Sequence, residues 1–193
     1  MLTYPEPAAR LRHPGQLLYG GFNKEFATLL IGGFGLLFLA GMGLWLLVLP
    51  HLRRTTVMLI GLGGLSASII GLTAINGLGV NQAHILASSY ALLILLPPVV
   101  LGVLLLSGFT PASLNHMAAI AELVPGKRGS AMGLYSVVMG VGQLVGATLG
   151  GLCVDLWGFY GLMVFSVAMG LASLGSVLYM RTHGQDLPYS SGS

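Results

Sequence analysis

The stretch Gly126–Gly158, GKRGSAMGLYSVVMGVGQLVGATLGGLCVDLWG, decides the class of fold. Two cations near its start precede about two dozen apolar or small residues, and the stretch contains nine glycines. In water, each glycine inside a helix costs about 1 kcal/mol relative to alanine. In a bilayer, helices associate through close packing, so small residues are useful there. The stretch therefore predicts a membrane-spanning helix that packs tightly on a neighbour.

The composition of the whole chain agrees with this interpretation. Of 193 residues, 55% are hydrophobic and 7% are charged, whereas soluble domains have about 25% charged residues. The one cysteine, Cys153, excludes a disulfide framework within the chain, and no metal-ligand spacing occurs. We therefore expect an integral membrane protein that is no enzyme, has no cofactor or metal and binds no nucleic acid.

Apolar stretches long enough to cross a ~30 Å hydrocarbon core occur along residues 26–180. Because lipid cannot satisfy open backbone groups, each is expected to be helical. The predicted fold is an all-α polytopic membrane bundle, with an irregular arm over 1–25 and a polar tail over 181–193. The five predicted spans are 26–49, 57–76, 88–124, 130–152 and 159–180. The third is long and contains Pro97, Pro98 and Pro111, so we predict one long, kinked helix there.

The distribution of cations predicts the orientation in the membrane. Arg53 and Arg54 follow the first span, Lys127 and Arg128 follow the third, and Arg181 follows the fifth. The two other connections between spans contain no Lys or Arg. The positive-inside rule therefore places these basic segments and the C-terminus in the cytoplasm. We expect the protein in the plasma (inner) membrane.

The glycines of the fourth span have a helical spacing. Gly142, Gly146 and Gly150 are four residues apart and form one ridge without side chains. Such a ridge indicates close approach of another helix. The ridge alone does not separate a static bundle from one whose helices slide or rock.

The run Pro111–Phe165 resembles the last three helices of a major facilitator superfamily transporter. The pattern of that superfamily has an acidic residue, a short basic loop, a glycine-rich helix and an acidic residue before the last helix. The residues that match are Glu122, Pro125, Lys127, Arg128, Gly129, Gly133, Gly142, Gly146, Gly150, Gly151, Asp155 and Gly158. Arg53 and Arg54 match the final pair of another loop motif, in which Leu49 and Pro50 replace an aspartate and an arginine.

The resemblance implies five helices of a six-helix half-bundle, corresponding to helices eight to twelve. Helix seven and the N-terminal half have no counterpart, so the chain resembles a C-terminal fragment. Such transporters bind solutes near the midplane between two halves and work by alternating access. The resemblance thus implies a secondary transporter of a small solute, with the lipid bilayer and the missing half or a second chain as partners.

Polar residues inside the predicted spans are candidates for the translocation path. Intramembrane polar side chains usually face the bundle interior or a water-filled path. Asn115 and His116 lie in the third span and Gln143 in the fourth. In the resembled family, the helices that would contain them line the cavity, and His116 could carry a coupling proton. Alternatively, they form hydrogen bonds between helices, or His116 bonds to Ser113. Glu122 is expected to pair with loop cations such as Arg128.

Two other classes of function stay open. The glycine faces would also suit a membrane interaction or scaffold subunit that never transports, or a half-transporter that needs a partner chain. An intramembrane serine protease is disfavoured, because GGLSAS at 63–68 has Ala67 where a nucleophile turn would have glycine. A histidine within hydrogen-bond reach of Ser66 would revive that alternative.

Overall fold

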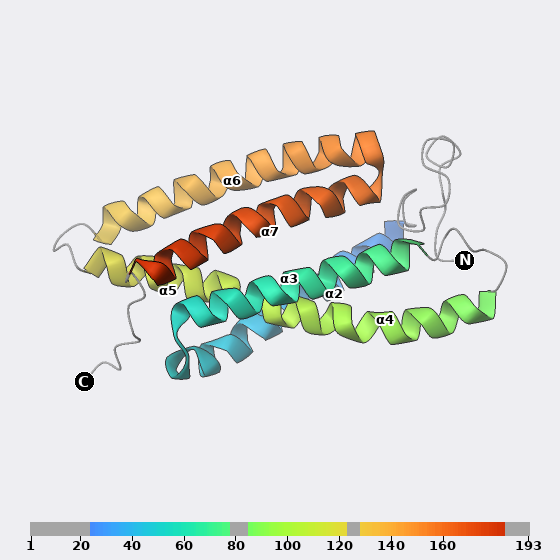
Figure 1. Ribbon diagram of the computed structural model, residues 1–193, viewed down its shortest axis with the longest axis horizontal. Helices are drawn as coiled ribbons and strands as arrows, with labels where there is room; N and C mark the ends of the chain where they lie inside the picture. The colour runs from blue at the N-terminus through green and yellow to red at the C-terminus, as the bar shows by residue number, and fades with distance from the viewer. Residues whose placement is uncertain (1–23, 78–84, 123–127, 184–193) are drawn as a thin grey trace.

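The computed structural model describes residues 24–77, 85–122 and 128–183 (Figure 1). These residues form helices that run along the long axis of the molecule. In chain order they are α2 (Lys24–Val48), the short η1 (Leu49–His51), α3 (Arg54–Gly77), α4 (Ile85–Leu106), α5 (Phe109–Glu122), α6 (Arg128–Trp157) and α7 (Phe159–Thr182). Residues 1–23 of the predicted irregular arm, most of the polar tail and Lys127 lie outside the described residues, whereas Lys24 and Glu25, predicted as the end of the arm, already belong to α2.

Five segments of the described chain are long and apolar enough to cross a membrane. They are Gly32–His51, Arg54–Gly77, Ile94–Ile120, Met132–Trp157 and Phe159–Thr182. The prediction of an all-α polytopic fold with five spans is confirmed. Pro50 lies at the start of η1, directly after α2 has ended at Val48. A proline is tolerated in the first turn of a helix, where its missing N–H would have no partner within the helix.

The third predicted span differs from its prediction. The structure has two helices, α4 and α5, with Ser107 and Gly108 between them, where one kinked helix was expected. Pro97 and Pro98 lie within α4 and do not end it. The interruption comes instead just before Pro111, which belongs to the first turn of α5.

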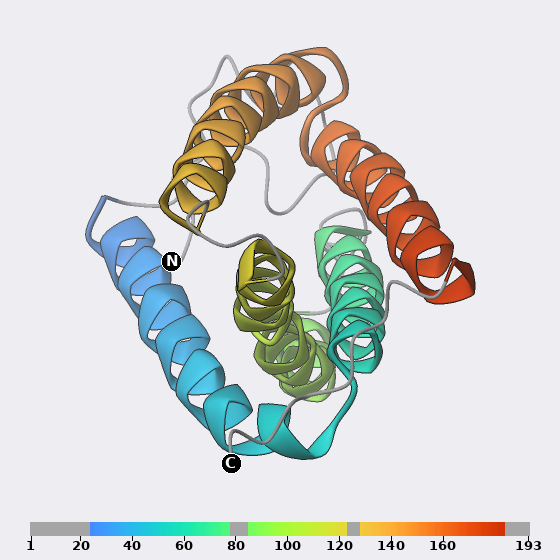
Figure 2. The ribbon, with the colours of Figure 1, turned by 90° about the vertical axis from the view of Figure 1, so that its left-hand side faces the viewer.

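Helix α3 is the central helix of the bundle. It contacts α4, α5 and α7, while α2 packs on α4 and α5, and α6 packs on α7 and α5. Seen along the helices, α4 and α5 lie between α2 and α3, α7 lies on the far side of α3 from α2, and α6 lies across the top of the view (Figure 2). In the most apolar stretch of α3, 39% of residues are buried, against 6% in α6. Most of α6 is therefore exposed.

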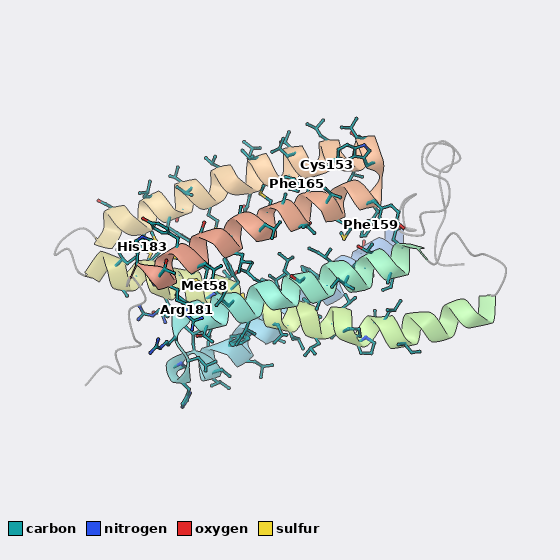
Figure 3. The ribbon with its side chains drawn as sticks, in the orientation of Figure 1. Met58, Cys153, Phe159, Phe165, Arg181 and His183 are labelled. Atoms are coloured by element: carbon teal, nitrogen blue, oxygen red, sulfur yellow. The ribbon has the colours of Figure 1, made fainter. Side chains whose placement is uncertain are left out.

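The apolar core lies toward the end of the bundle where α2 connects to α3. Its buried side chains come from α2, η1, α3, α5 and α7 and are Trp45, Leu49, Val57, Met58, Leu62, Ala112 and Val177. Figure 3 shows Met58, Arg181 and His183 at this end, and Cys153 and Phe159 toward the other. The basic start of α3 and the basic end of α7 thus lie at one end of the molecule.

A tight turn joins α6 to α7. Gly158 has φ 65° and ψ −151°, a region that is essentially restricted to glycine. Its N–H donates to the Val154 carbonyl at 2.8 Å, and its own carbonyl accepts from the Gly161 N–H at 3.0 Å. A side chain on Gly161 would collide with the Cys153 carbonyl. Two glycines thus allow α7 to fold back directly along α6.

Replacing Gly158 by alanine should destabilise this turn. The conformation costs a non-glycine residue about 1–3 kcal/mol. We expect the Gly158→Ala variant to unfold at a lower temperature in detergent, measured by thermal unfolding. Gly151→Ala is the matched control, because Gly151 lies in α6 with no described atom within 4 Å of an added Cβ. Equal unfolding temperatures for the two variants would contradict this account of the turn.

Candidate functional site

The break between α4 and α5 has a local cause in the sequence. In a continuous helix, the nitrogen at position 111 would donate to the carbonyl of Ser107, but proline has no N–H and its ring clashes with that carbonyl. Gly108 N–H donates to the Leu105 carbonyl at 3.2 Å, three residues back, and regular bonding resumes from Ala112 to Gly108. The Leu104 carbonyl therefore loses the partner that a continuous helix would have supplied.

Two side chains satisfy this Leu104 carbonyl. The indole Nε1–H of Trp45, on α2, donates to it at 2.9 Å, and the Ser107 hydroxyl donates at 2.7 Å. Trp45 is only 9% exposed. An unsatisfied backbone group costs several kcal/mol in a bilayer. Trp45 thus stabilises the bend from a neighbouring helix.

Small residues allow α2 to reach the bend. A Cβ on Gly108 would lie 2.5 Å from Cε2 and 2.7 Å from Nε1 of Trp45. A Cβ on Gly41, one turn before Trp45, would collide with the Ser107 side chain. The indole therefore lies directly on the backbone of the break. The sequence contains two signals for this contact: Gly108 lies three residues before Pro111, and Trp45 lies within another span.

The predicted path residues on α5 follow this bend. Asn115 is half-buried, and His116 is buried at 3% exposed. His116 lies one turn after Ala112, a fully buried core residue. Ser113, the alternative partner predicted for His116, donates its hydroxyl to the Thr110 carbonyl at 2.9 Å. The bend and the buried polar residues therefore belong to the same segment of the bundle.

Most polar and small residues of the fourth span are exposed, unlike the buried histidine of α5. Gln143 is exposed on α6, a helix that contacts α5. No described atom lies within 4 Å of a Cβ added to Gly142 or Gly146, whereas one on Gly150 would be 3.6 Å from Leu162 on α7. Tight packing of Gly142 and Gly146 therefore stays a prediction for a partner outside the described residues.

The predicted loop charges are only partly described. Arg53 is exposed at the start of α3, where its carbonyl accepts from Val57 N–H at 3.1 Å, and Arg54 is 5% exposed. Glu122 ends α5 and Arg128 begins α6, but their side chains are not among those described, and Lys127 lies in the gap. Their predicted pairing stays a prediction.

The described residues provide few groups for other chemistry. Among them there is no group of three or more His, Cys, Asp or Glu side chains that could hold a metal ion. The Ser66 hydroxyl donates to the Leu62 carbonyl at 3.1 Å, in the ordinary pattern of a serine within a helix. The Ser66 hydroxyl thus bonds within its own helix.

A bundle of long apolar helices defines a polytopic α-helical membrane protein, and in this one a span is interrupted. The sequence model of the Major Facilitator Superfamily matches residues 16–191. The chain belongs to this superfamily of membrane transporters. No curated protein and no solved structure matched the chain.

Proposed function

We propose that this chain forms part of a secondary transporter that moves a small solute across the membrane by alternating access. The observation that carries the proposal is the interrupted third span. Its break at Ser107 and Gly108 falls in the middle of the Ile94–Ile120 segment. Transporters of this kind commonly form their solute sites near the bilayer midplane from discontinuous helices.

The proposed path runs past α5 and α6. Asn115 and His116 follow the break on α5, and Gln143 lies on α6, which packs on α5. Backbone groups released at a break and polar side chains within a span are the kind of groups that contact solutes and coupling ions within a membrane. We assign these three residues to the path and His116 to a coupling proton.

The exposed face of α6 supports a second part of the proposal. Solute sites lie between two halves of such a transporter, and α6 has only 6% of its most apolar stretch buried. This face, with Gly142 and Gly146, would pack on the other half, supplied by the same polypeptide or a second chain. The chain would then be a fragment of the C-terminal half of the transporter. Arg53, Arg54 and the C-terminus would lie on the cytoplasmic side of the plasma membrane.

A permanent scaffold subunit is the second candidate function. An unpartnered α6 would serve a non-transporting membrane partner equally well. Two measurements distinguish the candidates: an immunoblot of native membranes against the tail 181–193, and transport by the affinity-purified native species. The chain alone has a mass of 20.1 kDa.

The transport assay uses proteoliposomes that contain pyranine, a fluorescent pH indicator. We would add sugars, amino acids, organic anions and organic cations in turn, together with a counterflow assay for uncoupled exchange. A solute-dependent flux by a species of roughly twice the mass supports a transporter with both halves in one chain. A 20 kDa band co-purifying with another membrane protein, without flux for any solute class, would overturn the proposal in favour of the scaffold.

His116→Gln should separate proton coupling from solute exchange. Glutamine retains hydrogen-bonding groups but cannot titrate near neutral pH. We expect the solute-driven pH change to fall at least tenfold while counterflow persists. His183→Gln is the control, because His183 is exposed at the end of α7, stacked on Tyr179 with ring centroids 4.0 Å apart. Equal pH signals from both variants would remove His116 from the coupling mechanism.

A further inference from the structure

A groove of about 480 Å³ lies between α3 and α7. Its walls come from these two helices alone, over residues 59–70 of α3 and 166–174 of α7. Both segments lie near the middle of their spans. Ligand sites commonly have volumes of ~300–1,000 Å³, so the groove is large enough for part of a small molecule within the hydrocarbon layer.

The lining of the groove favours an apolar occupant. Apart from glycines, it consists of aliphatic side chains and two serines. The Ser66 hydroxyl donates to the Leu62 carbonyl at 3.1 Å, and the Ser166 hydroxyl donates to the Leu162 carbonyl at 2.8 Å. Both hydroxyl protons are thus used within their own helices. The walls therefore offer a hydrocarbon surface with little capacity to recognise a polar group.

The length of the groove suits part of an acyl chain. Residues 59–70 extend over about 16 Å at ~1.5 Å per residue. Carbon atoms in contact are ~3.5–4.0 Å apart, so a polymethylene chain can lie along these residues in contact with the aliphatic side chains of both helices.

Basic residues lie at one end of the two helices that form the groove. Arg53 is exposed just before α3, about 9 Å of helix rise from Leu59 at ~1.5 Å per residue. Arg181 is exposed in the last turn of α7, about 10 Å from Leu174 on the same scale. Figure 3 shows Arg181 at the same end as Met58 of α3. Basic sites beside membrane helices on the cytoplasmic side bind anionic lipid headgroups.

We propose that this groove binds an anionic phospholipid, with one acyl chain between α3 and α7 and its phosphate beside Arg53 and Arg181. The apolar walls, the length of the groove and the cations one to two turns beyond it all match the parts of such a lipid. The site is independent of the proposed transport function, since none of its residues belongs to the proposed path.

Photolabelling in proteoliposomes tests the site. The probe is phosphatidylglycerol with a diazirine in the middle of one acyl chain, and labelled peptides are mapped by mass spectrometry. We expect labels concentrated on residues 59–70 and 166–174. Gly63→Trp should reduce this labelling at least fivefold, because Gly63 lines the groove and no described atom lies within 4 Å of an added Cβ. Gly43→Trp, at an equally open position on α2, should leave it unchanged.

The headgroup is tested separately. Arg181→Gln should weaken labelling by the phosphatidylglycerol probe at least threefold and leave labelling by the matching phosphatidylcholine probe unchanged. Uniform labelling of all exposed faces, including α6, would overturn the site in favour of ordinary boundary lipid. Equal labelling by a diazirine fatty acid would overturn the headgroup assignment. Protein cross-links in place of lipid labels would show that another helix occupies the groove.

Discussion

Gly64→Leu should abolish folding of the bundle, because Gly64 lies where the backbones of α3 and α4 approach each other closely. A Cβ at this position would lie 2.5 Å from the Gly102 carbonyl oxygen, 2.6 Å from Leu105 Cβ and 2.8 Å from Leu106 N. These atoms belong to or adjoin the backbone and cannot rotate away. Overpacking costs ~1–3 kcal/mol of folding stability where side chains can adjust. Because they cannot adjust here, we expect the free energy of unfolding to fall by more than about 3 kcal/mol.

The measurement is the yield and thermal unfolding of detergent-solubilised protein, followed by size-exclusion chromatography. Gly63→Leu is the matched control, one residue away on the same helix, since no described atom lies within 4 Å of its added Cβ. We expect near-normal yield and unfolding temperature for the control. If Gly64→Leu were as well folded as Gly63→Leu, α3 and α4 would not pack through Gly64 and Gly102.

Trp45→Ala should have the second largest effect. It removes a buried indole from the bend and one of the two donors to the Leu104 carbonyl. Truncation of a buried tryptophan to alanine costs ~3–5 kcal/mol in soluble proteins. We expect a comparable destabilisation, because the lost contacts leave both a cavity beside Gly108 and a weaker hydrogen-bond set at the break.

Two companion variants separate packing from hydrogen bonding. Trp45→Phe retains an aromatic ring without the donor and should cost about 1 kcal/mol, the usual net value of one hydrogen bond. Trp157→Ala is the control, because Trp157 is 59% exposed at the end of α6. Thermal unfolding provides the comparison. Equal losses from Trp45→Ala and Trp157→Ala would show that the indole does not stabilise the bend.

The class of fold could be predicted from composition because a bilayer imposes strict conditions on a chain. Long apolar stretches must be helical there, and the described residues contain five such spans. Pro50 and Pro111 also had local consequences that a sequence can reveal, since a proline nitrogen cannot donate. The sequence nevertheless predicted a kink in one continuous helix where the structure has a break. The break is stabilised by Trp45, which lies 59 residues before Leu104 in the chain.

The packing of the glycines could not be predicted from their positions. Gly63 and Gly64 are neighbours in the sequence, yet one is open and the other touches the α4 backbone. Gly102, a lone glycine in an apolar run, was missed although it is the partner of Gly64. Gly142 and Gly146, which have the most regular spacing, contact no described helix through an added Cβ.

The amino-acid sequence by itself thus determined the membrane class, the number of spans and the family pattern, since each depends on composition or on residues close together. The tertiary structure decided which faces are inside: the Gly64–Gly102 contact, the support of the bend by Trp45 and the groove between α3 and α7. The physical reason is that these helices are apolar on nearly all sides. Hydrophobic periodicity distinguishes buried from exposed faces only when the exposed face meets water.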